Sequence, residues 1–301
     1  MEQVKNILIT GGSGLVGGAI TTLLETNGFQ VAWLSRNPVK QVQKSYAWDI
    51  DAQTMDKAAL EWADAVIHLA GEGVADQKWT EERKQAILKS RTQSTQLLFK
   101  YANSADNPPK VFVSASAIGY YGMDTGDRML EENAAAGNDF LSEVVAAWEA
   151  EVEKFKNLDV RTVLLRIGIV LDAQGGALKE MLKPPVAAPL GDGKQWMSWI
   201  QISDLAGIFM YALQNENLSG TYNAVAPNPA TNRELTKAAA KAKGKLYMGI
   251  GVPPFVLKLV LGEMAQMVLG GNKVSSKKIE LAGYHFSFPQ LKEAMAKTFE
   301  K

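Results

Sequence analysis

Short apolar runs alternate with longer segments of helical periodicity along most of the chain. The first run, Ile7-Leu8-Ile9, is apolar throughout, which is typical of a strand buried on both faces of a parallel sheet. From Leu15 to Leu24, apolar residues instead recur at the spacing of one helix face. This alternation of strand and helix predicts an α/β protein with a doubly wound parallel sheet.

The same pattern predicts the later elements and two domains. Further strands are expected at 29–34, 46–49, 65–71, 110–113, 160–166 and 220–224, with helices at 80–102 and 139–156. Past Gly168 the pattern loosens, and the stretch from Lys183 to Gly193 is rich in proline and glycine, as substrate loops often are. We expect a main domain over 1–225, with a substrate-side excursion at about 172–200, and a small C-terminal α/β cap over 226–301.

Composition narrows the classes of protein and of partner. The chain has 301 residues, 47% of them hydrophobic, and its 32 basic and 32 acidic residues cancel, so no net field favours nucleic acid or an anionic membrane. It has no cysteine and two histidines, which argues against disulfides and a metal centre. The apolar stretch 252–271 is interrupted by Lys258 and Glu263, which favours an amphipathic core helix over a membrane span. We expect a cytoplasmic protein, monomeric or homodimeric, with a small-molecule substrate and neither a nucleic-acid nor a membrane partner.

The first strand runs directly into a glycine-rich turn and then a helix. Gly11, Gly14 and Gly17 have the Gly-x-x-Gly-x-x-Gly spacing of a dinucleotide-binding turn. Gly11 would allow the tight turn, Gly14 the approach of a pyrophosphate, and Gly17 the packing of helix on strand. The alternative is an ordinary strand-to-helix loop that contains glycines, but the strand–turn–helix context favours the nucleotide site.

The ends of the second and third strands carry two further candidates. Dinucleotide-binding folds specific for NAD place an acidic residue about 20 positions past the glycines, where it holds the ribose hydroxyls. Arg36 stands there instead, and a guanidinium pairs well with a 2′-phosphate, although a solvated surface arginine is the alternative. Asp49, at the end of the third strand, is placed either to meet the adenine amino group or simply to close a turn.

The fourth strand and the following helix supply the next candidates. Small Ala70 and Gly71 let a cofactor lie close over the end of this strand, whereas His68 within it is expected to be a packed core residue. Arg91 lies in the middle of the apolar face of the helix at 80–102, where a cation needs a partner. That partner is either a structural carboxylate or the cofactor or substrate.

Several motifs together resemble a known family. Thr10 to Gly17, His68 to Gly71 and the serine-rich stretch Ser114 to Gly122 resemble the extended short-chain dehydrogenase/reductases, the group of the sugar-nucleotide epimerases. A second set resembles one atypical branch of that group, an NADP-binding epimerase family of unknown substrate. This set comprises Ser35-Arg36-Asn37-Pro38, Ser90-Arg91, Trp148-Glu149, Gly175-Gly176-Ala177-Leu178, Trp196-Met197-Ser198-Trp199-Ile200, Pro253-Pro254-Phe255, Gly262-Glu263-Met264 and Phe286-Ser287-Phe288-Pro289.

The resemblance implies a Rossmann-type fold that binds NADP(H). The dinucleotide would lie on the glycine turn, its 2′-phosphate would meet Ser35 and Arg36, and its nicotinamide would lie near Ser116 and the Gly168-Ile169-Val170 strand end. Arg91 falls where the wider group usually has an asparagine, which supports a contact with the cofactor. The predicted cofactor-binding residues are Gly11, Ser13, Gly14, Leu15, Val16, Gly17, Ser35, Arg36, Asp49, Leu69, Ala70, Gly71, Arg91, Gly168 and Val170.

The chain departs from the wider group at its acid/base pair. That group has a tyrosine and, four residues later, a lysine on the helix after the serine; the lysine favours the phenolate and the tyrosine moves the proton. Counted back from Trp148-Glu149, these positions hold Leu141 and Val145, both on the apolar stripe of the helix. The usual mechanism therefore does not carry over to this chain.

Ser116, Tyr120 and Tyr121 are the remaining catalytic candidates. The Ser116 hydroxyl can hydrogen-bond a carbonyl oxygen, and either tyrosine can supply a proton if a cation such as Arg91 or Lys84 stabilises the phenolate. Structural roles are the alternative, because Ser116 can shape its loop and Tyr121 matches a packing residue of the wider group.

Two functions follow from these observations. The first is an NADP(H)-dependent oxidoreductase or epimerase that acts on a small carbonyl or sugar-nucleotide substrate without the Tyr-x-x-x-Lys pair. The second is a catalytically silent NADPH-binding sensor or scaffold. The serine, the tyrosines and the cap favour the enzyme, whereas Leu141 and Val145 favour the sensor.

Overall fold

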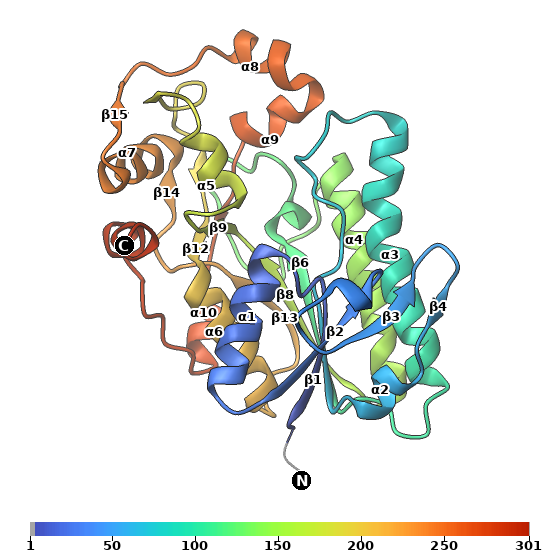
Figure 1. Cartoon of the computed structure of the whole chain (residues 1–301). Helices are drawn as coiled ribbons and strands as arrows, with labels where there is room; N and C mark the ends of the chain where they lie inside the picture. Colours follow the sequence, from blue (N-terminus) through green and yellow to red (C-terminus); the bar gives the residue numbers. More distant parts are fainter. Residues whose placement is uncertain (1–3, 301) are drawn as a thin grey trace.

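An eight-stranded sheet runs through the structure, a computed structural model that describes residues 4–300 (Figure 1). Its order is β13-β8-β6-β5-β1-β2-β3-β4, and every neighbouring pair is parallel except β3 and β4. The strands are β1 (Asn6–Thr10), β2 (Gln30–Ser35), β3 (Ser45–Asp49), β4 (Thr54–Met55), β5 (Ala65–His68), β6 (Val111–Ala117), β8 (Arg161–Ile167) and β13 (Gly220–Ala224). The predicted doubly wound sheet is confirmed, and its strand order reverses between β1 and β5, where such folds bind ligands.

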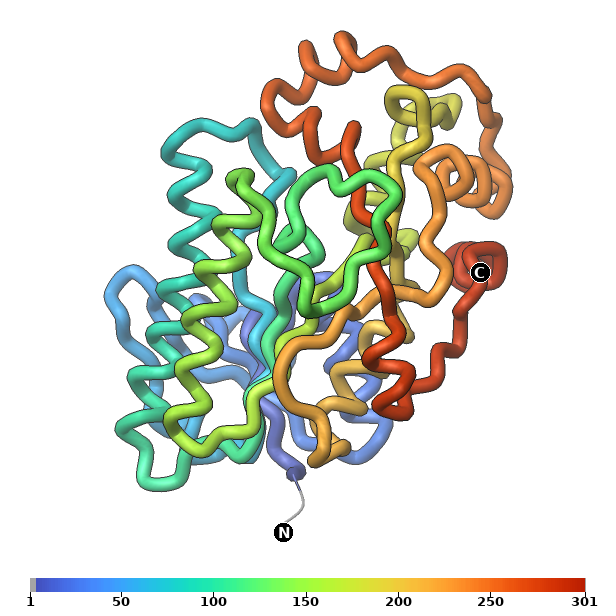
Figure 2. Tube along the Cα trace, turned by 180° about the vertical axis from the view of Figure 1, so that it is seen from behind, coloured from blue at the N-terminus to red at the C-terminus, as the bar shows by residue number. Residues whose placement is uncertain are grey.

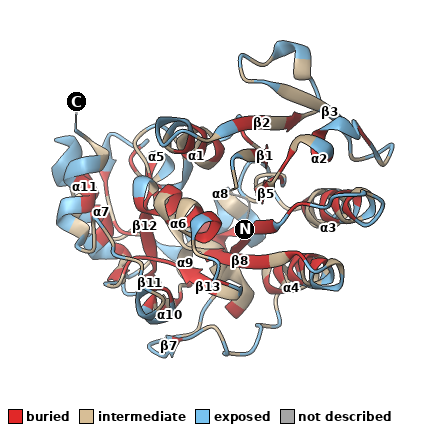
Figure 3. Ribbon diagram, turned by 90° about the horizontal axis from the view of Figure 1, so that it is seen from below, coloured by how far each residue is buried: buried red, intermediate tan, exposed pale blue. Residues whose placement is uncertain are grey.

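Helices cover both faces of the sheet. α1 (Leu15–Thr26) and α6 (Ile202–Gln214) pack on one face, and α3 (Glu81–Asn103) and α4 (Phe140–Glu153) on the other, with the short α2 (Ala58–Trp62) before β5 (Figure 3). α3 begins where the Thr80 hydroxyl accepts the N–H of Arg83 at 3.1 Å. α4 begins with a reciprocal pair of bonds between Asp139 and Ser142. Both helices lie where the sequence predicts them.

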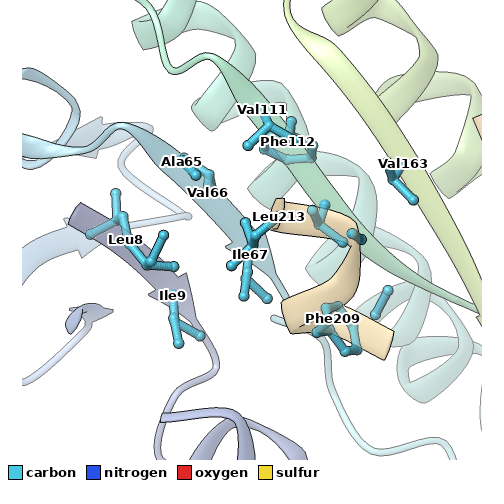
Figure 4. Packing of buried hydrophobic residues seen from close by; sticks show 14 of the residues in the cluster. Leu8, Ile9, Ala65, Val66, Ile67, Val111, Phe112, Val163, Phe209 and Leu213 are labelled. Atoms are coloured by element: carbon cyan, nitrogen blue, oxygen red, sulfur yellow. The ribbon is translucent and has the colours of Figure 1, made fainter. Parts of the chain in front are cut away.

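The main core lies between the sheet and these helices. The side chains of Ile7, Leu8 and Ile9 in β1 are fully buried, as a strand covered on both faces requires. Figure 4 shows side chains of β1, β5, β6 and β8 gathered with Phe209 and Leu213 of α6. This rigid core fixes the carboxyl ends of the central strands, where the candidate site lies.

A second core joins the excursion to the C-terminal residues. Its buried members include Leu178, Trp199, Leu235 and Met295, so the excursion at 172–200 and the residues after 226 share one interior. The elements around it are β9 (Ile169–Leu171), α5 (Gly176–Met181), β10 (Val186–Ala187), β11 (Trp196–Met197), β12 (Trp199–Gln201), β14 (Ala230–Thr231), α7 (Asn232–Lys243), β15 (Leu246–Tyr247) and α11 (Leu291–Thr298). The division at residue 225 stays a prediction.

The segment between β15 and α11 returns to the main sheet. It forms α8 (Pro254–Leu261), α9 (Ala265–Leu269), β16 (Lys273–Val274), which pairs with β7 (Met129–Leu130), and α10 (Lys277–Leu281), which packs against β13. The 3₁₀ turns of the chain are η1 (Pro38–Lys40), η2 (Ile118–Tyr121), η3 (Lys154–Leu158) and η4 (Gly262–Met264).

At the start of α6, the buried carboxylate of Asp204 accepts the N–H groups of Ser287 at 2.8 Å and Phe288 at 2.9 Å. This carboxylate anchors the Phe-Ser-Phe-Pro motif.

The apolar stretch 252–271 differs from the single amphipathic core helix that its sequence predicts. Gly262, at φ +61°, ends α8 and separates it from α9. Phe255 and Leu259 on α8 are largely exposed, and Leu257 is its buried residue. Among the described residues, no helix has both the length and the apolar character that crossing a bilayer requires.

Candidate functional site

In the glycine turn between β1 and α1, Gly11 and Gly17 leave no room for a side chain. Gly11 has a φ of +69°, and a Cβ there would lie 3.1 Å from the backbone of Leu69. A Cβ at Gly17 would lie 2.4 Å from the carbonyl oxygen of Gly11, so the helix touches the turn directly. Gly14, the N-cap of α1, supplies no side-chain hydrogen bond to the first-turn N–H groups. The turn therefore has the backbone shape and the open helix N-terminus that suit a pyrophosphate.

The other residues of this turn have different surroundings. Ser13 is exposed, Val16 packs against the main core, and a Cβ at Gly175 of the excursion would lie 3.2 Å from the Leu15 side chain. Packing against β2 requires glycine at position 12, which the sequence pattern did not reveal. A Cβ there would lie 2.4 Å from the indole of Trp33 in β2, whose Nε1 donates to Thr21 of α1 at 3.0 Å.

The ends of β2 and β3 open onto a cleft of about 810 Å³ beside α3. Arg36 is exposed and lines this cleft, together with Lys89, Ser90 and other residues of α3. The Ser35 hydroxyl accepts the N–H of Asn37 at 3.1 Å, which shapes the turn that carries Arg36. At the end of β3, Oδ1 of the exposed Asp49 accepts the N–H of Ala52 at 2.9 Å, so this carboxylate closes a turn.

The end of β5 is held by a buried hydrogen-bond chain. The Thr10 hydroxyl accepts the N–H groups of Leu69 at 3.0 Å and Ala70 at 3.1 Å and lies 2.8 Å from Nδ1 of His68. Nε2 of His68 lies 3.0 Å from the Thr95 hydroxyl, which donates to the carbonyl of Arg91 and so accepts from the ring. Burial lowers the pKa of His68 to about 3, with the charge of Arg91 adding to this effect. The prediction that His68 is a core residue is confirmed.

Arg91 lies against Gly71 at the end of β5. A Cβ at Gly71 would lie 3.1 Å from Cζ of Arg91, so glycine permits this contact. Nη1 of Arg91 donates to the carbonyl oxygens of Glu72 at 3.0 Å and Ile87 at 3.1 Å, and no described carboxylate lies in ion-pair contact with the guanidinium. Burial lowers the pKa of Arg91 to about 10, although Glu72 works against this shift. Within residues 4–300, Nε and Nη2 make no hydrogen bond, which leaves these donors to a ligand.

The end of β8 turns toward the cap through Gly168. A Cβ at Gly168 would lie 2.4 Å from the carbonyl oxygen of Ser198, so the strand passes the cap in close contact. Val170 then pairs with Ile200 in the β9–β12 ladder. These two residues lie where the end of β8 meets the excursion at 172–200.

Ser116 belongs to a buried polar network. Its hydroxyl donates to Oε1 of Glu149 at 2.5 Å, and the same oxygen accepts from Nε of Arg166 at 2.8 Å. Oε2 of Glu149 accepts from Nη2 of Arg166 at 2.7 Å, which completes a bidentate ion pair. Burial alone would lower the pKa of Arg166, but the hydrogen bonds and charge of Glu149 outweigh it and raise that pKa. The single hydroxyl proton of Ser116 is thus engaged by a carboxylate.

Tyr120 and Tyr121 meet Arg166 in different ways. The Tyr121 hydroxyl donates to Oδ1 of Asn223 at 2.7 Å and accepts from Nη1 of Arg166 at 3.1 Å. Burial raises the pKa of Tyr121, although the bond from Arg166 works against the rise. Tyr120 is half-buried, and Cζ of Arg166 lies 3.4 Å from its ring centroid. Its hydroxyl makes no hydrogen bond to any residue between 4 and 300, so its proton is available.

The two positions of the missing acid/base pair face the same turn. Leu141 and Val145 of α4 come within 3.8 Å and 4.0 Å of where a Cβ at Gly119 would lie. Their side chains offer no proton and no cation. The family's acid/base position is therefore filled by packing between α4 and η2.

Glu149 and Arg166 were not predicted as site residues. Glu149 lies beside Trp148 in one of the quoted motifs, and Arg166 interrupts the apolar run of β8. A cation within a strand buried on both faces needs a partner, and this was the available signal. The cation expected from the sequence is Arg91 or Lys84, whereas the structure pairs Lys84 with Glu263 at 2.7 Å and Glu81 at 3.3 Å.

Metal ligands do not gather at this edge of the sheet. In the part of the chain that the structure describes, no three His, Cys, Asp or Glu side chains come together as a metal site.

Comparisons with known proteins identify the family of the chain. The model of the NAD dependent epimerase/dehydratase family matches residues 7–162, and a domain of unknown function, DUF1731, matches residues 252–298. The chain therefore belongs to the NAD dependent epimerase/dehydratase family. Within it, the chain is similar to proteins named only as epimerase family proteins. One is YfhF of Bacillus subtilis, 33% identical over 97% of both chains, and another is mouse SDR39U1, 35% identical over 96% of this chain and 98% of its own.

Solved structures extend the comparison. Human epimerase family protein SDR39U1 (isoform 2), determined with NADPH, has a TM-score of 0.88 and 34% identity and covers 98% of this chain and 99% of its own. A nucleoside-diphosphate sugar epimerase from Corynebacterium glutamicum has a TM-score of 0.79 and 30% identity, over 99% of this chain and 58% of its own. The UDP-glucose 4-epimerase of Thermus thermophilus, with NAD, has a TM-score of 0.73 at 21% identity over 98% of both chains, which shows a shared fold.

Proposed function

We propose that this protein is an NADP(H)-dependent oxidoreductase or epimerase that acts on a small carbonyl or sugar-nucleotide substrate without a Tyr-x-x-x-Lys pair. The observation that carries the proposal is the phenol of Tyr120. Its hydroxyl has no hydrogen-bond partner within residues 4–300, and the guanidinium carbon of Arg166 lies 3.4 Å from its ring centroid. A free proton beside a buried cation is what proton exchange with a substrate oxygen requires.

The residues at the carboxyl edge of the sheet fit a dinucleotide. A Cβ at Gly11 or Gly17 would crowd the backbone of the turn, so the turn needs glycine at both positions. The N-terminus of α1 has no side-chain cap. The Thr10 hydroxyl fixes the backbone at Leu69 and Ala70, and Arg91 keeps two donors, Nε and Nη2, that make no hydrogen bond within residues 4–300. A nicotinamide cofactor bound there would supply or accept a hydride. The human relative with NADPH supports this assignment.

Arg36 supports NADP(H) over NAD(H). It is exposed at the end of β2 and lines the cleft where an adenosine would lie, and Ser35 orders its turn. An arginine pairs with a 2′-phosphate by charge-assisted hydrogen bonds, whereas it cannot accept a bond from a 2′-hydroxyl. Asp49 already accepts the N–H of Ala52, so its contact with adenine stays a prediction.

The remaining side chains have distinct roles in the proposal. In the reductive direction, the carbonyl oxygen of the substrate would take the proton of Tyr120, which would leave a phenolate. The fixed charge of Arg166 stabilises this phenolate, and Glu149 holds Arg166 in place. The hydroxyl groups of Ser116 and Tyr121 donate hydrogen bonds to Glu149 and Asn223, so these two residues hold the arrangement in place. Their direct contact with substrate remains a prediction.

One screen separates the enzyme from the alternative function. The purified protein is assayed for NADPH oxidation with a panel of small aldehydes, ketones and sugar nucleotides, and for epimerisation of the sugar nucleotides by chromatography. The proposal expects turnover with at least one class, at a rate that requires Tyr120. Tight NADPH binding without turnover across the panel would reject it.

A catalytically silent NADPH-binding sensor or scaffold is the second candidate. The observation in its favour is that Leu141 and Val145 fill the family's acid/base position with packing against η2. Engagement of the Ser116 and Tyr121 protons by buried partners points the same way. For this function we expect the amide hydrogen exchange of the cap to change on NADPH binding, with no consumption of the cofactor.

A further inference from the structure

The C-terminal module, residues 252–298, passes directly beside the turn that carries Tyr120. Figure 2 shows its orange-red segment crossing next to the green loop that follows β6. The segment has no space for side chains at its two glycines: a Cβ at Gly270 would lie 2.3 Å from the carbonyl oxygen of Met123, and one at Gly271 would lie 2.0 Å from that of Trp196. The N–H of Thr125 also donates to the carbonyl of Gly271 at 3.2 Å. This part of DUF1731 therefore packs tightly between the loop that contains Met123 and the strand that contains Trp196.

Asn272, the next residue, holds both ends of η2. Its Nδ2 donates to the carbonyl oxygen of Gly122 at 2.6 Å and to that of Ile118 at 3.3 Å. Its Oδ1 accepts from the hydroxyl of Thr125 at 2.9 Å, and the residue is 6% exposed. Tyr120 lies between the two anchored carbonyl groups, on a turn of four residues.

The backbone around Asn272 is fixed independently of η2. The Ser198 hydroxyl donates to the carbonyl oxygen of Asn272 at 2.8 Å and accepts the N–H of Val274 at 2.9 Å. The N–H of Ser275 donates to the carbonyl of Leu130 at 2.9 Å, which extends the β16–β7 pairing. Because Ser198 and β7 hold this segment from outside, its amide imposes a position on η2.

We propose that Asn272 is a positioning residue for Tyr120, and that ordering this turn is a function of the C-terminal module. The inference rests on the proposed function, in which Tyr120 exchanges a proton with substrate. Arg166, held by Glu149, supports one face of the phenol, and Asn272 fixes the backbone that carries it. Two donors on one amide, aimed at two carbonyl oxygens, make asparagine specific here, because aspartate has no amide hydrogens to give.

The first readout is the environment of Tyr120, which does not depend on any substrate. The protein is labelled with 3-fluorotyrosine, and Tyr120→Phe assigns its ¹⁹F resonance. Asn272→Asp places a carboxylate against two carbonyl oxygens, and we expect the Tyr120 resonance to shift or broaden. The resonance of Tyr46 in β3, far from η2 in the chain, should stay in place.

The second readout is kinetic, with the best substrate of the carbonyl screen. Asn272→Asp should lower kcat by roughly tenfold to a hundredfold, because a small displacement of a reacting group is costly. The dissociation constant for NADPH should stay unchanged, since Asn272 touches none of the predicted cofactor residues. Asn228→Asp is the matched control: its Nδ2 also donates to a carbonyl of the module, that of Pro289 at 3.0 Å, without touching η2. It should leave the resonance and kcat unchanged.

The outcomes separate the two proposals. An unmoved Tyr120 resonance in folded Asn272→Asp would overturn the positioning role. A moved resonance with unchanged kcat would keep the positioning role and reject Tyr120 as the proton donor. Should Asn272→Asp fail to fold, Thr125→Val removes the hydroxyl that orients the amide and should move the resonance less but detectably. No movement in that variant would also overturn the inference.

Discussion

The hydroxyl of Ser116 donates to Glu149 across 2.5 Å, and the same carboxylate holds the guanidinium of Arg166. A serine in this family's position would be expected to face a substrate oxygen, but here its proton lies within a buried ion pair. The pair in turn brings Arg166 against the ring of Tyr120. The phenol of Tyr120, and not the hydroxyl of Ser116, is therefore the group with a free proton.

The buried pair gives a stability prediction. Glu149→Leu should lower the free energy of unfolding by about 3–5 kcal/mol, because Arg166 would stay buried without a counter-charge. Urea unfolding followed by circular dichroism measures this change. Glu149→Leu with Arg166→Met should recover most of the loss, since the uncompensated charge is then gone.

The matched control is an exposed ion pair between the last residue of α4 and η3. Glu153→Gln breaks the contact with Lys156 and should change the free energy of unfolding by less than about 0.5 kcal/mol. Equal losses for Glu149→Leu and Glu153→Gln would show that the buried pair does not hold Arg166 as described.

The parts of the site that the sequence predicts are those set by local chemistry. Gly11 and Gly17 are required by a turn whose shape depends on neighbours within a few residues. The burial of Ile7 to Ile9 follows from an apolar run, and Thr80 caps the helix that it precedes. Such features need no knowledge of which distant segments meet.

The remaining features depend on contacts between distant segments. Ser116 meets Glu149 from a helix 33 residues later, and Asn272 reaches Gly122 across 150 residues. Gly12 is a glycine because the indole of Trp33 in the next strand occupies the space of its side chain. No periodicity or spacing in the chain carries that information, so the network around Tyr120 could not be assembled from sequence.

Arg36 predicts the choice of cofactor. The protein should bind NADPH more tightly than NADH by roughly 1.5–3 kcal/mol, because the guanidinium makes charge-assisted bonds to the 2′-phosphate. Fluorescence titration with both reduced cofactors measures the difference. Arg36→Ala should abolish the preference, and Lys40→Ala, an exposed cation on the following turn, should keep it. A preference that survives Arg36→Ala would contradict the assignment.

Arg91 predicts a change in cofactor affinity without a change in fold. Arg91→Leu keeps an apolar side chain against Gly71, so the melting temperature should move little while NADPH binding weakens, because the unpaired Nε and Nη2 donors are lost. Differential scanning fluorimetry and titration measure the two effects. A lower melting temperature with an unchanged dissociation constant would assign Arg91 a purely structural role.

His68 predicts how stability depends on pH. Its pKa in the folded protein is about 3, against 6.5 for an unburied histidine, so the unfolded chain takes up a proton that the folded chain refuses between these values. Stability is therefore lost as pH falls from 6.5 toward 3, by up to about 1.4 kcal/mol per pH unit. His68→Gln should flatten this dependence in urea unfolding at pH 4 to 7. His285→Gln, at an exposed position, should not, and an equal effect of both variants would refute the prediction.

The most direct test of the account is the rate of NADPH oxidation in Tyr120→Phe with the best substrate of the carbonyl screen. Removing one proton donor should lower kcat by about 10²–10⁴-fold and leave the dissociation constant for NADPH unchanged. Tyr46→Phe, a change of the same atoms on β3, should leave kcat at its original value. A Tyr120→Phe variant that turns over like the unmodified protein would contradict the proposal that this phenol supplies the proton.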